Sequence, residues 1–135
     1  MDLFYHLKPC QQEETLLWEG EPVLQICCQR PEFSALDPKA AQRINRYYHR
    51  AETLFLRRCR TRLYQRAGAD LVEKRAASRP FTPWKADLSF TLEEQPASLV
   101  VTLCYTLCQG EEVSHSNRRS ECWDLSTGFP VAENL

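Results

Sequence analysis

The chain has little of several features that mark specialised proteins. Its 135 residues include only four glycines and one methionine, and 17 Lys and Arg nearly balance 18 Asp and Glu, for a formal charge of −1. That balance excludes a polycationic tail protein and a strongly acidic buffer protein. The longest stretch without charge, Gln95 to Gly110, has 16 residues, fewer than the roughly 20 apolar residues of a membrane helix. We therefore predict no membrane insertion.

The N-terminus, Met-Asp-Leu-Phe-Tyr-His, lacks both the cationic start and the apolar run of a signal peptide. This predicts a cytoplasmic protein. Seven cysteines, an odd number, leave at least one thiol unpaired in a monomer, and a reducing compartment fits them best. With 43% hydrophobic and 26% charged residues, the chain has the composition of one globular domain.

The first half of the chain predicts a hairpin followed by a long helix. Two strand-like segments, Thr15–Trp18 and Val23–Cys27, flank a turn signal of Gly and Pro. An irregular connector over Arg30–Leu36 leads to Asp37-Pro38, which combines a good N-cap with a good first helical residue. From there to about Arg66, apolar residues recur at spacings of three and four without Gly or Pro. A helix of that length exceeds the core, so we expect its far end to project or bend.

Two further expectations concern this helix. On a regular helical wheel, Arg58 and Arg62 share the face of the apolar stripe, which predicts weaker burial after about Phe55 unless these side chains snorkel outward. Gly68 is the expected helix breaker, with a shorter helix from about Ala69 to Ala77 behind it.

The second half of the chain is typical of strands. Trp84–Thr91 alternates apolar and polar residues, Leu99–Cys108 is apolar on both faces and predicts a central strand, and Ser120–Leu125 is a third candidate. A helix with one apolar stripe and a sheet with one apolar face each need a partner. We therefore predict an α+β fold, with one long helix packed across a four- to five-stranded antiparallel sheet.

Some of these segments resemble a known family. The segment Pro31–Leu36, followed by Ile44-Asn45, is similar to a pattern of proline, short spacer and an Ile-Asn pair in the first turns of a long helix. The residues from Asp124 to Gly128 resemble the Asp-Leu-x-Thr-Gly end of the same family, and Ser98–Thr102 resembles its central strand. That family is the extracytoplasmic sensor-type domain of the anti-sigma-V factor, also found at the front of peptidoglycan deacetylases.

The resemblance runs from about Glu21 to Leu135 and covers only the first half of the family domain. It implies a single domain over residues 1–135, with an N-terminal extension over 1–13 and a sensor-like α+β domain over 14–135 that lacks the family's second half. Where the family usually has a Gly-Gly-Ala-His turn, this chain has Gln109 to His115. The resemblance implies a bacterial sensing or ligand-binding domain and an extracytoplasmic location as the alternative. It carries over neither deacetylase activity nor a membrane anchor.

No residue pattern indicates an enzyme, a cofactor or a metal. The nearest candidate for zinc is the set Cys104, Cys108, His115 and Cys122. Its first two members fall about 13 Å apart on a predicted strand, whereas two thiolates on one zinc lie about 4 Å apart. A cysteine nucleophile needs a base, and the three histidines, His6, His49 and His115, are no more than chance supplies. We predict no catalytic, cofactor or metal residues. We assign the tryptophans to core packing, with a sugar-binding platform as the alternative if two of these rings lie exposed and coplanar.

The most unusual feature is the charge of the predicted helix. Nine of the 17 cations lie between Lys39 and Arg66, against the single acid Glu52. Five of them cluster within about 60° on a helical wheel beside the apolar stripe, namely Lys39, Arg43, Arg46, Arg50 and Arg57. The plain interpretation is a solvated face offset by acids on neighbouring loops. The functional alternative is an anion-binding surface.

These observations predict a non-enzymatic binding or sensing domain that contacts a protein or an anionic wall polymer. The alternative is an anion- or nucleic-acid-binding module that uses the basic helix face. Nucleic acid is the weaker alternative, because the chain is near neutral and carries no recognition motif. A homodimer is also predicted, since a sheet cut short leaves an unpaired edge that a second copy can cover.

Overall fold

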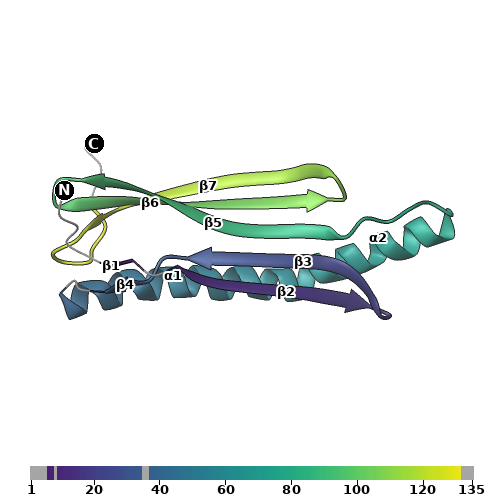
Figure 1. Cartoon of the computed structure of the whole chain (residues 1–135), viewed down its shortest axis with the longest axis horizontal. Coiled ribbons are helices and arrows are strands. Elements are labelled where there is room, and N and C mark those ends of the chain that lie inside the picture. The colour runs from purple at the N-terminus through teal and green to yellow at the C-terminus, as the bar shows by residue number, and fades with distance from the viewer. Residues whose placement is uncertain (1–5, 8, 35–36, 132–135) are drawn as a thin grey trace.

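The computed structural model describes residues 6–7, 9–34 and 37–131. One long helical rod lies along one face of a five-stranded sheet (Figure 1), which confirms the predicted α+β class. In sheet order the strands are β2 (Cys10–Trp18), β3 (Glu21–Arg30), β5 (Trp84–Gln95), β6 (Ser98–Gln109) and β7 (Glu112–Asp124). The rod consists of α1 (Pro38–Arg58), a π-helical turn η1 (Cys59–Leu63) and α2 (Tyr64–Ala76). A second, small sheet pairs β1 (His6–Leu7) with β4 (Phe33–Ser34).

The sheet is mixed, which corrects the prediction of an all-antiparallel sheet. Three neighbouring pairs of strands run antiparallel, but β3 and β5 run parallel, with Leu24 opposite Trp84. The helical rod connects these two strands. A crossover of that kind returns the chain to the end of the sheet where it began, so the second strand runs in the same direction as the first.

Asp37 caps α1 as the sequence predicts. Its carboxylate accepts hydrogen bonds from the backbone N–H groups of Lys39 and Ala40 at 3.1 and 3.3 Å. The rod then buries one continuous stripe, which forms a single core with apolar side chains of the strands. The buried members of the rod are Ala40, Ile44, Tyr48, Glu52, Phe55, Leu56, Cys59, Leu63, Ala67, Gly68 and Leu71.

The π-helical turn explains why burial continues past Phe55. Buried residues recur every four positions from Cys59 to Leu71, and on a regular α-helix that spacing drifts by about 40° at each step. A π turn holds more residues per turn and rotates the following residues back towards the sheet. Arg62 lies within this turn and is exposed, so the wheel that placed it on the buried face was wrong. Arg58 precedes the turn and is also exposed, with its guanidinium 5.8 Å from the centroid of the Tyr105 ring. As expected, α2 projects beyond the ends of the strands (Figure 1).

Gly68 lies inside α2 rather than ending a helix, so the prediction of a breaker was wrong. A Cβ atom at this position would lie 2.3 Å from the ring of Trp18, and the glycine therefore lets β2 approach the rod closely. The ring centroid of Trp18 lies 5.4 Å from that of Tyr64, whose hydroxyl donates to the carbonyl of Leu17 at 2.6 Å. A glycine needed for close packing has the same sequence signature as one needed for a turn.

β7 begins at Glu112, well before the predicted start at Ser120. Its residues 112–120 are all exposed, so no apolar alternation marks them in the sequence. The first strand also begins earlier than predicted, at Cys10, and the connector predicted to be irregular contains β4. Residues 1–5 and 8 of the predicted N-terminal extension lie outside the described residues. β6 pairs on both sides, as predicted for a central strand.

The turn after β7 folds back onto the start of α1. The carboxylate of Asp124 accepts hydrogen bonds from the backbone N–H groups of Ser126 and Thr127 at 2.8 and 3.4 Å. Gly128 has a φ of +74°, and a Cβ atom there would lie 2.5 Å from the carbonyl oxygen of Ala40. Only glycine satisfies both the backbone angle and this close approach.

Gly128→Ala is therefore expected to lower the free energy of unfolding by about 2–4 kcal/mol, which combines left-handed backbone strain with overpacking. Gly20→Ala is the matched control, because Gly20 has a φ of +83° but nothing within 4 Å of the added Cβ. Backbone strain alone should cost this control about 1 kcal/mol. Urea unfolding followed by circular dichroism measures both, and equal losses would show that the contact with Ala40 adds nothing.

Candidate functional site

Four cationic side chains form a row on the side of α1 that faces away from the sheet. They are Lys39, Arg46, Arg50 and Arg57, and we call them the cationic ridge. At about 100° per residue they point within about 40° of one another, opposite the buried Tyr48, and they extend over about 27 Å of helix. All four are exposed. Within the described part of the chain, none of them forms an ion pair.

Arg43 does not belong to this ridge, although the sequence groups it there. Its guanidinium donates to the carbonyl oxygen of Thr127 at 2.7 Å and lies 4.2 Å from the centroid of the Phe129 ring. A cation over an aromatic face is attracted by the ring quadrupole. The charge of Arg43 therefore holds the turn after β7 against α1.

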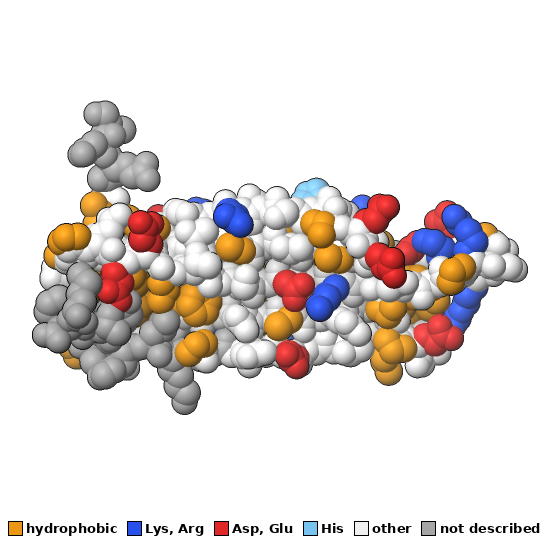
Figure 2. Space-filling model, turned by 45° about the horizontal axis from the view of Figure 1, so that its top comes forward, with side chains coloured by type: hydrophobic (Ala, Val, Ile, Leu, Met, Phe, Trp, Pro, Cys, Tyr) orange, Lys and Arg blue, Asp and Glu red, His pale blue; other side chains and the backbone are white. Residues whose placement is uncertain are grey.

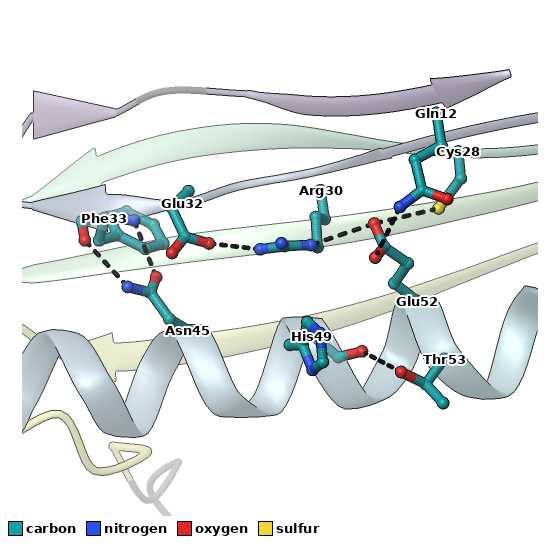
Figure 3. A network of polar contacts seen from close by, with 9 residues as sticks. All are labelled: Gln12, Cys28, Arg30, Glu32, Phe33, Asn45, His49, Glu52 and Thr53. Carbon is teal, nitrogen blue, oxygen red and sulfur yellow. Dashed lines mark hydrogen bonds and ion pairs between the residues drawn. The ribbon is translucent and has the colours of Figure 1, made fainter.

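The single acid of this helix segment, Glu52, points into the core and does not offset the ridge. Glu52 is 4% exposed, and its carboxylate accepts a hydrogen bond from Nε of Arg30 at 3.0 Å (Figure 3). Arg30 also pairs with Glu32, and the side-chain amide of Gln12 lies 3.5 Å from the Glu52 carboxylate. The buried carboxylate thus ties α1 to β3.

A hollow of about 400 Å³ opens beside the ridge, between α1 and the end of β3. It is lined by Arg30, Glu32, Gln42, Asn45, Arg46 and His49. Asn45 serves the fold, because its amide donates to the carbonyl of Phe33 at 2.9 Å and accepts from the N–H of Phe33 at 2.8 Å (Figure 3). These two bonds fix β4 against α1. The Ile44-Asn45 pair that carried the family resemblance therefore has a structural role.

The opposite side of the molecule suits an anion less well. Figure 2 looks onto the sheet, where uncharged polar side chains and backbone dominate and charged side chains are scattered. A hollow of about 280 Å³ on this side is lined by three acids, Glu13, Glu14 and Asp87, against the single cation Lys85. Burial raises the pKa of the Asp87 carboxyl, and Lys85 opposes that shift. Repulsion by the acids disfavours an anionic ligand here.

The cysteine and histidine candidates are not brought together. The strand register places Cys104, Cys108 and Cys122 on the sheet face away from the rod, whereas His115 lies opposite Leu107 on the other face. Among the described residues, no three His, Cys, Asp or Glu side chains gather in a metal-binding arrangement. The side chain of His6 lies outside the described part of the chain.

Burial keeps several thiols protonated. Burial is the main cause that raises the pKa of Cys28 and of Cys59 to about 12, and the nearby Glu52 contributes to the raised pKa of Cys28. The pKa of Cys27 is also raised, first by burial and then by Asp87. The thiolate is the nucleophilic form of cysteine, so these three thiols are poor nucleophiles.

The tryptophans serve the core, as predicted. Nε1 of Trp84 donates to Asp70 at 2.9 Å, and Nε1 of Trp123 donates to the hydroxyl of Tyr48 at 2.6 Å. Trp84 and Trp123 are 5% and 3% exposed, too little for either ring to serve as a binding platform. In the described chain, no helix is both long and apolar enough to cross a bilayer.

Comparison with protein-family models and with curated proteins gives no match. Among solved structures, the crystal structure of a DUF3298 family member from Bacteroides fragilis matches 94% of this chain with a TM-score of 0.66 and 13% identity. A DUF3298 family protein from Pseudomonas aeruginosa matches 96% with a TM-score of 0.56 and 16% identity. The chain shares their fold. It spans 58% and 56% of the lengths of these two proteins.

At such identities the similarity shows the fold alone. The neighbours are members of a family of unknown function. Nothing in the comparisons links the chain to the anti-sigma-V factor or to a deacetylase accessory domain. The comparisons thus give no support to the resemblance to that particular family.

Removing the buried carboxylate tests how α1 is held on the sheet. Glu52→Ala is expected to destabilise the fold by about 3 kcal/mol, because it strips the guanidinium of Arg30 of its buried partner. Glu14→Ala is the control, since the pair of Glu14 with Arg60 is largely exposed and should contribute at most about 1 kcal/mol. Urea unfolding of both variants gives the comparison. Similar small losses in both would contradict a stabilising role for the buried pair.

Thiol titration tests the protonated cysteines. At pH 8 the native protein should react slowly with an aromatic disulfide reagent at Cys28 and Cys59, because both thiols are buried and neutral. The fast phase of the labelling reaction, which reports the accessible thiols, should be unchanged in the double variant Cys28→Ser, Cys59→Ser. In denaturant, all thiols of the wild type should react. Fast labelling of Cys28 in the native state, located by peptide mass spectrometry, would contradict the assignment.

Proposed function

We propose that the chain is a non-enzymatic binding domain that holds an anionic partner on the cationic ridge. The observation that carries this proposal is the exposure of Lys39, Arg46, Arg50 and Arg57 on one side of α1, with no ion pair to any described acid. A solvated face of ordinary composition mixes both signs of charge. Here the only acid of the segment is turned into the core, so the positive field of the ridge is left for a partner.

The chemistry of the ridge favours an acidic protein surface as the partner. A formal charge of −1 and a pI near 6.3 give the whole chain little long-range attraction to a nucleic acid. The ridge is a single row on a convex helix, and it suits carboxylates presented by another folded surface. An anionic wall polymer is the second candidate, and a sensing role, as the sequence resemblance implies, fits either partner.

The absence of catalysis is part of this proposal. It is supported by the protonated state of Cys27, Cys28 and Cys59, whose raised pKa values make them poor nucleophiles. It is also supported by the structural roles of Asn45 and Asp124, which serve β4 and the last turn. The polar groups that stand out in the sequence are thus used by the fold.

Binding to fluorescein-labelled poly-L-glutamate, followed by anisotropy at low salt, tests the ridge. The triple variant Arg46→Gln, Arg50→Gln, Arg57→Gln is expected to bind about tenfold more weakly than the wild type, since three exposed charge pairs are lost. The matched control, Arg66→Gln, Arg79→Gln, Lys85→Gln, removes the same number of exposed cations elsewhere and should bind like the wild type.

Equal weakening in both triple variants would contradict a specific ridge. A labelled 20-base-pair DNA duplex in place of the peptide tests the alternative partner. Tight DNA binding that falls steeply with salt and is lost in the ridge variant would replace the acidic protein with nucleic acid. No binding of either probe at low salt would overturn the proposal.

A further inference from the structure

Among the described residues, the outer edge of β7 has no partner strand along most of its length. β7 is the last strand of the sheet, its residues 112–120 are exposed, and it contains no proline. A long exposed edge presents a row of N–H and C=O groups that can pair with another strand. Folded proteins usually cover or interrupt such an edge, so an open one needs an explanation.

The far end of this edge already carries an added segment from the chain itself. The N–H of Asp124 donates to the carbonyl of Phe129 at 2.9 Å, and the N–H of Val131 donates to the carbonyl of Cys122 at 2.7 Å. These bonds show that the N–H and C=O groups of residues 122 and 124 point away from β6, in the plane of the sheet, towards its open edge. They also show that the geometry of this edge accepts an antiparallel neighbour.

The N–H and C=O groups of successive residues in a strand point alternately to its two sides, which gives three more residues whose backbone groups point to the open edge. Because the direction reverses at each residue, the N–H and C=O groups of Ser116, Arg118 and Ser120 also point outward. Those of Asn117 and Arg119 point inward to β6. An irregularity of the register near Cys108 lies on the N-terminal side of Ser116, so the stretch from Ser116 to Ser120 is regular.

The charge of this stretch indicates the chemistry of its occupant. Arg118 and Arg119 stand on opposite faces of the sheet, and no carboxylate lies between residues 115 and 120. The next acid, Glu121, accepts a hydrogen bond from the hydroxyl of Tyr47 at 3.3 Å and lies 3.8 Å from Arg119. Side chains directly opposite one another in an antiparallel pair interact, and opposite charges stabilise the pairing.

A second copy of this chain fits the edge poorly. A two-fold pairing of β7 with itself, centred on Arg118 or Arg119, would set that arginine opposite its own copy, and like charges in opposite positions are destabilising. Centred on Asn117, it would set Arg118 opposite Ser116 and Arg119 opposite His115, so neither arginine would face a carboxylate. The other edge of the sheet, β2, carries Glu13 and Glu14 and therefore does not suit an acidic strand. Of the two outer edges of the five-stranded sheet, taken over the described residues, it is the β7 edge that combines a regular unpaired backbone with cations on both faces.

We propose that the edge of β7 from Ser116 to Ser120 binds an extended acidic segment of a partner protein by antiparallel strand addition. The outward backbone groups supply the hydrogen bonds, and Arg118 and Arg119 select two consecutive acids, one on each face of the sheet. This surface is separate from the cationic ridge on α1.

Amide hydrogen exchange by NMR tests the strand addition directly. The probe is an acetylated peptide, Thr-Val-Thr-Glu-Glu-Thr-Val-Thr. In the free protein the amides of Ser116, Arg118 and Ser120 should exchange fast, while those of Asn117 and Arg119 are already protected. Saturating peptide should slow exchange at the three outward amides at least about tenfold, because each gains a backbone hydrogen bond. A peptide with Lys-Lys in place of Glu-Glu should not.

Two variants separate the backbone from the charges. The double variant Ser116→Pro, Ser120→Pro removes two outward donors without touching the inward ladder, and should weaken peptide binding about tenfold. Ser116→Thr, Ser120→Thr is its control and should bind like the wild type. Arg118→Glu, Arg119→Glu tests the charges even if the proline variant does not fold, and should reverse the preference towards the Lys-Lys peptide.

Several outcomes would overturn this proposal. The first is an absence of protection at the three outward amides, and the second is equal binding of both peptides by the wild type. A mass that rises with concentration in light scattering without peptide, together with the same three amides protected, would assign the edge to a second copy. The ridge variant Arg46→Gln, Arg50→Gln, Arg57→Gln should retain binding of this peptide. The proposal for the β7 edge and the proposal for the cationic ridge can therefore fail independently of each other.

Discussion

The structure depends on keeping one side of a 39-residue helical rod against the sheet from end to end. A regular α-helix with buried residues at every fourth position would turn its stripe away from the strands, and Arg62 would take the place of Leu63 in the core. Burying an unpaired guanidinium costs far more than burying leucine gains. The π turn prevents this from Cys59 onward, while the side of α1 opposite its buried stripe carries the cationic ridge.

Much of this architecture could be predicted from local signals. The Asp37-Pro38 start, the first hairpin and the strands around Trp84 and Leu103 each follow from capping, turn chemistry or alternation. The parallel pairing of β3 and β5 could not, since it depends on the path of the connection in space. The polar half of β7 was missed for a different reason, because an edge strand with both faces in water has no apolar pattern to detect.

The candidate site, like the fold, could be predicted from the sequence only in part. Helical spacing is sufficient to group Lys39, Arg46, Arg50 and Arg57, since the angle between residues on a helix is fixed. It could not separate Arg43 from them, because the carbonyl that Arg43 binds is 84 residues away in the sequence. The hydrogen bonds of Asn45 and the turn at Asp124 show that distinctive sequence motifs can serve the backbone rather than a ligand.

The contacts that fasten the turn after β7 to α1 also bear on how the chain folds. Trp123 donates a hydrogen bond to Tyr48, which lies 75 residues earlier in the sequence. The packing of α1 is therefore complete only after β7 has joined the sheet. Such long-range closure raises the contact order and slows folding relative to a helical bundle of this size. During synthesis the amphipathic rod would leave the ribosome before its sheet is complete, with its apolar side open to chaperones.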